Sequence, residues 1–313
     1  MKTIGFPRML HEPQEVRAFS PRFINSVQGK AVIEKGYGLG MGYKGYLCEQ
    51  VSRNQCLASD IVVTIRCPLE QDLVLLRPGS VLFCMLHYPT HPVRNTLLKS
   101  LGVTCFSMDA VTDDSGRRLV ENLRGTARYG VRAAVQAWHA QNPFGGLIHA
   151  LVMGSGGVGR MAVDELIHAT QAPVCVSVVG RSVTGDKGLM KSLLKDTDIL
   201  VDATYRSDPS QVIVTRDMVR VMPKQAVICD LAVDPDIRAI EDIPIGDLSK
   251  TLHCWDRKVV SCYGWPATHP HECMMAYERQ LQELLTEVIK GGEFFEDDNN
   301  PLRRALARAI QKP

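Results

Sequence analysis

One short stretch of this chain carries glycines at the spacing that dinucleotide binding requires. An apolar run over Leu147–Met153 is typical of a buried strand, and a glycine-rich turn and then a helical pattern follow it. The glycines permit a sharp turn, close approach of a pyrophosphate and tight packing of the helix, whose N-terminal N–H groups favour phosphate oxygens. We predict that this turn binds the phosphates of a dinucleotide. Its residues are Gly154, Ser155, Gly156, Gly157, Val158 and Gly159.

The residues after the next strand indicate which dinucleotide binds. Pro173–Val179 predicts that strand, and Gly180, Arg181 and Ser182 follow it. An acidic side chain at this place accepts hydrogen bonds from a ribose 2′-OH, whereas Arg181 and Ser182 suit a 2′-phosphate. The sequence therefore favours NADP(H), with NAD(H) as the alternative if Arg181 faces solvent. Thr204, at the end of the following predicted strand, completes the expected cofactor site.

Polar residues after other predicted strands are the candidates for substrate chemistry. The guanidinium of Arg66 suits bidentate binding of a substrate carboxylate. His87 can exchange a proton near neutral pH, and Asp234 can stabilise a cationic imine or ammonium. Without such roles, they would be a surface arginine, a partly buried histidine and a capping aspartate. The preceding strands are predicted over Ile61–Ile65, Ser80–Leu86 and Ala226–Leu231.

Two further patterns favour a structural interpretation. Gly36–Gly42 is rich in glycine but lacks a long strand before it and a clear helix after it. We therefore interpret it as a flexible loop and not as a second nucleotide site. His269, His271 and Cys273 alternate where a helix begins, but no recognisable ligand pair accompanies them, so we expect no metal site. One of these histidines could instead line the ligand cleft.

The composition is that of an ordinary globular protein and excludes several classes. The 313 residues carry a net charge of +2, with 45% hydrophobic and 22% charged residues. There is no basic stripe with interleaved aromatics, so we expect no nucleic-acid binding. Apolar runs stay below the roughly 18–20 residues that span a bilayer, and the N-terminus lacks a signal-peptide pattern. Ten scattered cysteines without a CxxC pair indicate reduced thiols, so we expect a cytoplasmic protein.

Strands and helices alternate throughout, which predicts an α/β fold of two Rossmann-like domains with a cleft between them. A helix predicted over Leu119–Ala140 is long enough to bridge the two domains. The nucleotide-binding domain is expected at residues 126–274, inserted in the middle of the chain. Residues 1–125 and 275–313 would form a discontinuous substrate domain, ending in a helix over Pro301–Gln311.

Five segments resemble, in the same order, the alanine dehydrogenase and pyridine nucleotide transhydrogenase superfamily. They are IGFPRMLHEPQEVRAFSP, DIVVTIRCPL, RPGSVLFCMLHYPTHP, GSGGVG and VTRDMVRVM with AVICDLAVDPD. The resemblance implies that Arg17 binds the carboxylate of pyruvate and that Arg66 replaces a substrate-binding lysine. It also implies that His87 and Asp234 are catalytic. Hydride would pass between the nicotinamide and a C=N bond formed from a 2-oxo acid and an amine, and we expect a homo-oligomer.

Several departures from the alanine dehydrogenases look more like carboxyethyl-ornithine synthase, an opine-type relative. They are the Gly-Arg-Ser after the second strand, the EKGYG segment and the shorter chain, while the arginine at 66 suggests a changed substrate. That class joins pyruvate reductively to the side-chain amine of a basic amino acid. Our main hypothesis is therefore NADPH-dependent reduction of such an imine. The alternatives are an alanine dehydrogenase that uses ammonia, a cyclic imine reductase and a non-catalytic NADP-binding sensor.

Overall fold

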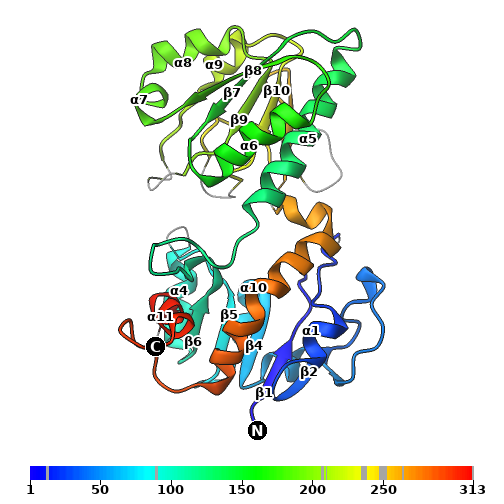
Figure 1. Ribbon diagram of the computed structural model, residues 1–313, viewed down its shortest axis with the longest axis vertical. Helices are drawn as coiled ribbons and strands as arrows, with labels where there is room; N and C mark the ends of the chain where they lie inside the picture. The colour runs from blue at the N-terminus through cyan, green and yellow to red at the C-terminus, as the bar shows by residue number, and fades with distance from the viewer. Residues whose placement is uncertain are drawn as a thin grey trace. The chain divides into compact units, whose positions relative to one another are not determined.

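The chain divides into two compact α/β units. Unit 1 comprises Met1–Glu121 and His269–Pro313, and unit 2 comprises Asn122–Thr268 (Figure 1). The predicted α/β class with two Rossmann-like units is confirmed. This computed structural model describes residues 1–11, 14–88, 91–205, 208, 210–233, 238–246, 252–262 and 264–311.

The described residues of unit 1 form a seven-stranded sheet in the order β13-β6-β5-β4-β1-β2-β3. All neighbours pair in parallel except β13, which is antiparallel to β6. The central strand β4 is buried at five consecutive residues, because helices cover both faces of a parallel sheet. The strands are β1 (Thr3–Phe6), β2 (Lys30–Glu34), β3 (Glu49–Val51), β4 (Ile61–Arg66), β5 (Val81–Met85), β6 (Thr104–Ser107) and β13 (Ile310–Gln311).

Short helices and one long helix pack on this sheet. Ser20 caps the first helix by accepting a hydrogen bond from the Phe23 N–H, and Pro21 follows it at the first helical position. The long helix α10 buries Met274, Tyr277 and Leu281 in the core of unit 1. The helices are α1 (Pro21–Asn25), α2 (Arg53–Leu57), α3 (Glu70–Leu73), α4 (Pro92–Ser100), α10 (Pro270–Lys290) and α11 (Pro301–Ala309).

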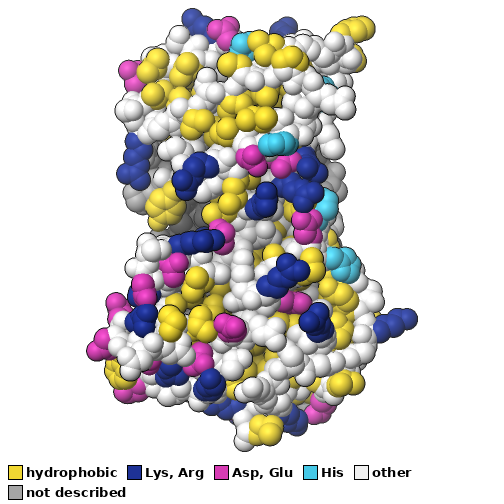
Figure 2. Space-filling view, in the orientation of Figure 1, with side chains coloured by type: hydrophobic (Ala, Val, Ile, Leu, Met, Phe, Trp, Pro, Cys, Tyr) yellow, Lys and Arg dark blue, Asp and Glu magenta, His cyan; other side chains and the backbone are white. Residues whose placement is uncertain are grey.

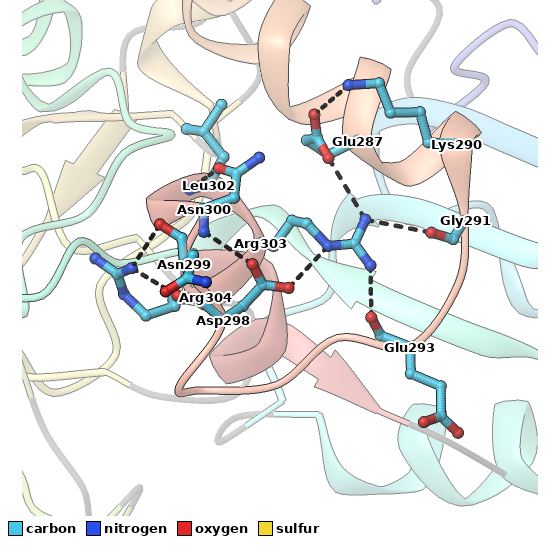
Figure 3. A network of polar contacts seen from close by, with 10 residues as sticks. All are labelled: Glu287, Lys290, Gly291, Glu293, Asp298, Asn299, Asn300, Leu302, Arg303 and Arg304. Atoms are coloured by element: carbon cyan, nitrogen blue, oxygen red, sulfur yellow. Dashed lines mark hydrogen bonds and ion pairs between the residues drawn. The ribbon is translucent and has the colours of Figure 1, made fainter.

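The end of the chain differs from the prediction. The helix expected over Pro301–Gln311 stops at Ala309, and β13 then pairs with the edge of β6. Arg303 fixes this segment: it donates to the Asp298 carboxylate (3.1 Å) and to the Gly291 carbonyl (3.2 Å), and it lies 3.4 Å from Glu287 (Figure 3). The unpaired backbone groups of an edge strand explain why Ile310 and Gln311 leave the helix.

The described residues of unit 2 form a six-stranded sheet in the order β11-β12-β10-β9-β7-β8, parallel except for β11. Helices α5 and α6 cover one face, and α8 and α9 cover the other. The strands are β7 (Ile148–Met153), β8 (Val174–Val179), β9 (Ile199–Asp202), β10 (Val227–Asp230), β11 (Leu252–Cys254) and β12 (Arg257–Ser261). The helices are α5 (Leu123–Gln141), α6 (Gly157–His168), α7 (Arg181–Thr184), α8 (Lys187–Leu194) and α9 (Arg216–Val221).

One expected helix start is corrected. Helix α5 begins at Leu123 and not at Leu119, because the Asn122 side chain accepts the Gly125 N–H and caps the helix there. Thr215 is the N-cap residue of α9, but its side chain makes no cap bond. The Glu241 carboxylate accepts the Arg216 N–H instead (2.7 Å).

The state of the cysteines and the hydropathy of the helices can be compared with what the composition predicts. All ten cysteines lie in the described part of the chain as free thiols, and eight of them are buried. None of the helices among the described residues combines the length and the hydropathy that crossing a bilayer requires.

Candidate active site

The glycine turn of unit 2 has the shape of a phosphate cradle. Gly154 has a φ of +102°, and a Cβ there would lie 2.5 Å from the Ala203 carbonyl oxygen. A Cβ on Gly159 would lie 1.8 Å from the Gly154 carbonyl oxygen, so only glycine fits at both positions. Around Gly156 there is open space within 4 Å, and no side chain caps α6. The amides at this helix end are therefore placed to bind an anion.

The other cofactor candidates lie at neighbouring strand ends. The Gly154 N–H donates to the Val179 carbonyl (2.9 Å), which joins the glycine turn to the end of β8. Arg181 and Ser182 are exposed at the start of α7, directly after that strand. Thr204 donates through its N–H and its hydroxyl to the Asp202 carboxylate at 3.0 and 2.7 Å. The candidates thus follow three adjacent strands, β7, β8 and β9.

In unit 1, three of the four substrate candidates follow strands of one parallel sheet. Arg17 lies in the loop after β1, Arg66 is the last residue of β4, and His87 follows β5. Strands β1, β4 and β5 are neighbours in the sheet, so these loops lie at the same edge. Asp234 lies outside the described residues.

A buried ion pair holds Arg17. Its Nε and Nη2 donate to the two carboxylate oxygens of Glu15 at 2.9 and 2.5 Å, and the side chains are 4% and 2% exposed. Burial acts to raise the pKa of Glu15, but hydrogen bonds and the charge of Arg17 outweigh it and lower that pKa. Burial likewise opposes the charge of Arg17, whose pKa is nevertheless raised by Glu15. Arg66 Nη1 lies 3.5 Å from the same carboxylate.

The remaining nitrogen of the Arg17 guanidinium faces a weak partner. Nη1 lies 3.9 Å from the Cys273 sulfur. A thiol is a poor acceptor, so a substrate carboxylate would replace it favourably. Cys273 therefore lies beside the candidate substrate site, whereas the ring of His271 packs edge-on against Tyr43 at 5.4 Å.

The second glycine-rich segment is a compact turn that positions Arg17. The Tyr37 hydroxyl accepts the Phe19 N–H (2.9 Å), and the Tyr46 hydroxyl donates to the Phe19 carbonyl (2.7 Å). A Cβ on Gly40 would lie 2.7 Å from Val16, so this glycine permits close approach of the two segments. A pocket of about 170 Å³ lies between the turn and the pair of Glu15 and Arg17. The interpretation of this stretch as a loop missed its positioning role.

His87 is held by a carboxylate that the sequence analysis did not identify. Asp109 accepts the Leu86 N–H (2.9 Å), the His87 N–H (3.3 Å) and the Ser107 hydroxyl (2.7 Å). Its other oxygen lies 3.5 Å from His87 Nδ1. These bonds support the turn at His87, whose φ of +49° is unusual for a side-chain-bearing residue.

The protonation of His87 reflects opposing effects. Burial lowers its pKa, the charge of Asp109 raises it, and the charge of Arg118 lowers it again, with a net decrease. The side chain keeps 44% exposure, so solvent limits the size of this shift. The imidazole is thus mainly neutral at pH 7, which suits a group that accepts a proton.

Arg118 and His11 are two further residues that the sequence analysis missed. The Nε of Arg118 is buried and makes no hydrogen bond to the described residues, while its Nη2 donates to the Val120 carbonyl (3.3 Å). Burial and the charge of Arg66 lower the pKa of His11 to about 4, so its ring stays neutral and donates to the Cys67 carbonyl (2.9 Å). The paired arginines of GRR at 116–118 were the available signal for Arg118. Among the described residues, no group of three His, Cys, Asp or Glu side chains is arranged to bind a metal.

The glycine turn in unit 2 is typical of a dinucleotide-binding α/β protein, and the arginine-rich sheet edge in unit 1 is a candidate site for an anion. Comparison with known proteins agrees. The family description "Alanine dehydrogenase/PNT, N-terminal domain" matches residues 18–128, and "Alanine dehydrogenase/PNT, C-terminal domain" matches residues 146–309. The chain belongs to the alanine dehydrogenase/PNT family.

Relatives and solved structures extend this similarity over most of the chain. An alanine dehydrogenase of Bacillus subtilis (strain 168) is 24% identical over 74% of this chain and 70% of its own length. Alanine dehydrogenase 1 of Staphylococcus aureus (strain NCTC 8325 / PS 47) is 22% identical over 95% of this chain and 88% of its own. An L-alanine dehydrogenase structure aligns with a TM-score of 0.77 at 17% identity, covering 98% of this chain and 94% of its own. The structure of a transhydrogenase from Sinorhizobium meliloti aligns with a TM-score of 0.72 at 19% identity, covering 92% of this chain and 95% of its own.

These findings confirm several expectations from the sequence. The predicted superfamily, its nicotinamide nucleotide and the class of NAD(P)-dependent oxidoreductase are confirmed. The choice between NADP and NAD and the closer likeness to carboxyethyl-ornithine synthase stay predictions.

Proposed function

We propose that this chain catalyses hydride transfer between a nicotinamide cofactor and the C=N bond formed from a 2-oxo acid and an amine. The observation that carries the proposal is the edge of the unit 1 sheet, where Arg17, Arg66 and His87 follow neighbouring strands. Two guanidiniums there suit a carboxylate, and a neutral imidazole suits proton exchange beside it. The glycine cradle of unit 2 fits the cofactor's pyrophosphate, and the cofactor supplies or accepts the hydride.

Ammonia is the amine that the relatives favour, since those reported above are alanine dehydrogenases. In this proposal Arg17 and Arg66 hold the carboxylate of the 2-oxo acid. His87 takes a proton from ammonium, and later returns one to the hydroxyl that leaves the carbinolamine as water. Asp234, by its match to the family motif, stabilises the cationic imine before hydride arrives at its carbon.

A second candidate is the opine-type reaction, in which the amine belongs to an amino acid. Two observations favour it. Arg66 stands where the family carries a lysine, and Arg118 offers a further guanidinium with a buried Nε. Burial lowers the pKa of His87 and the charge of Arg118 adds to that decrease, whereas burial raises the pKa of Tyr277 and the charge of Arg118 opposes that increase. In a product with two carboxylates, Arg17 and Arg66 would bind one carboxylate and Arg118 would bind the other.

We also propose NADP(H) as the cofactor, on the strength of Arg181 and Ser182 after β8. An Arg181→Asp substitution should remove the 2′-phosphate contact and favour the ribose hydroxyl. We expect the preference for NADPH over NADH to fall at least about tenfold, in line with a lost charge-assisted hydrogen bond of roughly 1.5–3 kcal/mol. An unchanged ratio of kcat/KM for the two cofactors would contradict this assignment.

An absorbance assay at the nicotinamide band separates the candidates. Pyruvate with ammonia is compared with pyruvate plus single amino acids that carry a side-chain amine, at matched concentrations. A larger kcat/KM with ammonia supports the alanine dehydrogenase reaction, and a larger value with a diamino acid supports the opine-type reaction. If the chain binds NADPH but no pair of pyruvate and amine leads to NADPH oxidation, the remaining candidate is a non-catalytic nucleotide-binding sensor.

A further inference from the structure

Unit 1 has a pocket that the proposed reaction does not use. The face of this unit in Figure 2 mixes basic, acidic and apolar side chains without one extended patch of a single kind. Extended apolar surface marks contact sites for large partners, whereas sites for small molecules are concave. A pocket of about 230 Å³ lies on the glycine-rich turn at 36–42 and on the segment that follows it.

Three tyrosines form the wall of this pocket, Tyr37, Tyr43 and Tyr46. The rings of Tyr37 and Tyr46 pack edge-on with centroids 5.8 Å apart, and Tyr43 packs edge-on against His271. Burial raises the pKa of each tyrosine hydroxyl, so all three side chains stay neutral. Leu39, which is 72% exposed, adds an apolar side chain to the lining. Such a wall suits a flat apolar group, because aromatic rings favour edge-on and offset contacts with each other.

The polar groups of the lining favour an anion. Lys44 forms no ion pair within the described part of the chain, and none of the described residues that line the pocket is acidic. The N–H groups of Lys44, Gly45 and Tyr46 donate no hydrogen bond to the described residues. An ammonium and successive N–H groups of a turn are donors that suit a carboxylate. Glu278, whose charge reaches the tyrosines, does not line the pocket, and it accepts the N–H and the hydroxyl of Ser20 instead.

The same tyrosines connect this pocket to the candidate substrate site. Tyr37 accepts the Phe19 N–H and Tyr46 donates to the Phe19 carbonyl, so both hold the segment that carries Arg17. The residues at 36–40 also line the pocket of about 170 Å³ that contains Arg17. A ligand on the tyrosine rings therefore stabilises the turn in the form that positions Arg17.

We propose that this pocket binds a small aromatic carboxylate as an effector, with its ring on the three tyrosines and its carboxylate on Lys44. The volume lies below the roughly 300–1,000 Å³ of pockets for drug-sized ligands, so a single ring with a short acid chain suits it. The bound effector lowers the KM for the 2-oxo acid, because Arg17 is then already in place. This coupling rests on the proposed function, whereas binding to the pocket does not.

Calorimetry tests the binding with three probes. Phenylpropanoate carries a ring and a carboxylate, phenethylamine carries the ring with a cation, and propanoate lacks the ring. We expect phenylpropanoate alone to bind, with a dissociation constant of about 1 mM or below. No binding up to about 10 mM, or equal binding of the amine or of propanoate, would overturn the site.

Two lysine variants test the position of the carboxylate. Lys44→Gln should weaken the binding of phenylpropanoate about fivefold, the upper range for an exposed ion pair. Lys99→Gln is the matched control, since Lys99 is an exposed lysine of α4 that does not line the pocket. It should bind phenylpropanoate as the wild type does. Equal affinities of the two variants would overturn the placement on Lys44.

Initial rates test the coupling to the substrate site. At saturating phenylpropanoate the KM for pyruvate should fall about fivefold, the lower end of allosteric couplings, with kcat unchanged. Lys44→Gln should need about five times more effector for the same decrease. An unchanged KM would overturn the effector role, and a KM that rises equally in both proteins would place the acid in the substrate site instead. If no pair of pyruvate and amine reacts, the proposed function fails, and calorimetry still decides the binding site.

Discussion

Alanine substitutions at two glycines of the phosphate cradle should differ in their effect on stability, although both should weaken cofactor binding. Gly159→Ala places a Cβ 1.8 Å from the Gly154 carbonyl oxygen. Ordinary C···O contacts begin near 3.3 Å, so α6 must move by about 1.5 Å. Overpacking of this kind costs about 1–3 kcal/mol, which corresponds to a Tm decrease of several degrees. Cofactor affinity should fall as well, because the helix end that binds phosphate moves.

The matched control is Gly156→Ala. This position has a φ of −71° and no atom within 4 Å of an added Cβ, so alanine fits the folded chain. Loss of the glycine N-cap costs about 1 kcal/mol at most. The added methyl group would nevertheless occupy the space through which a pyrophosphate approaches the backbone. We therefore expect nearly wild-type thermal stability with at least tenfold weaker binding, about 1.4 kcal/mol.

Both variants are measured by thermal unfolding without ligand and by fluorescence titration with NADPH. The expected pattern is a lower Tm for G159A alone and weaker binding for both. A G159A variant with unchanged Tm would contradict the packing argument. A G156A variant that binds NADPH as tightly as the wild type would refute the placement of the pyrophosphate.

Three further predictions concern unit 1. Glu15→Gln should lower the free energy of unfolding in urea by about 3–5 kcal/mol, because it leaves the buried charge of Arg17 uncompensated. A decrease below about 1 kcal/mol would contradict this. Glu15→Asp, which keeps the charge, is the control. Asp109→Asn removes the charge that raises the pKa of His87, so the acid limb of the pH profile of kcat/KM should move to lower pH. An acid limb at the wild-type pH would show that Asp109 does not control the protonation of His87. Arg303→Ala should reduce the free energy of unfolding by about 1–3 kcal/mol through the lost contacts of Figure 3; Arg303→Lys should restore little, because lysine lacks the fork of donors.

Local patterns predicted the elements and the strand ends well. Continuous β-branched runs became the central strands, and the rule that ligands lie beyond the carboxyl ends of strands selected Arg66 and His87. The two glycines that must be glycine, Gly154 and Gly159, were identified from spacing alone. The strands and the spacing of the glycines are patterns of residues near in sequence, so the sequence displays them directly, although the close contact at Gly154 is with the distant Ala203.

The features that were missed depend on contacts between distant segments. Glu15 contacts Arg17 two residues away, but its contact to Arg66 joins two different strand ends. Asp109 meets His87 only because β5 and β6 are neighbours in the sheet. The last two residues of the described chain, at 310 and 311, follow a helical pattern yet pair with β6, since an open edge there offers hydrogen bonds. Neither spacing nor propensity carries this information.

The central claim is hydride transfer to the carbon of a C=N bond, and isotope transfer tests it most directly. NADPH that carries deuterium at both hydrogen positions of the nicotinamide C4 is incubated with the enzyme, pyruvate and the amine that gives the highest kcat/KM. Mass spectrometry of the amino acid product should show one deuterium at C2. Product without deuterium, or consumption of NADPH without any amine product, would contradict the proposed reaction.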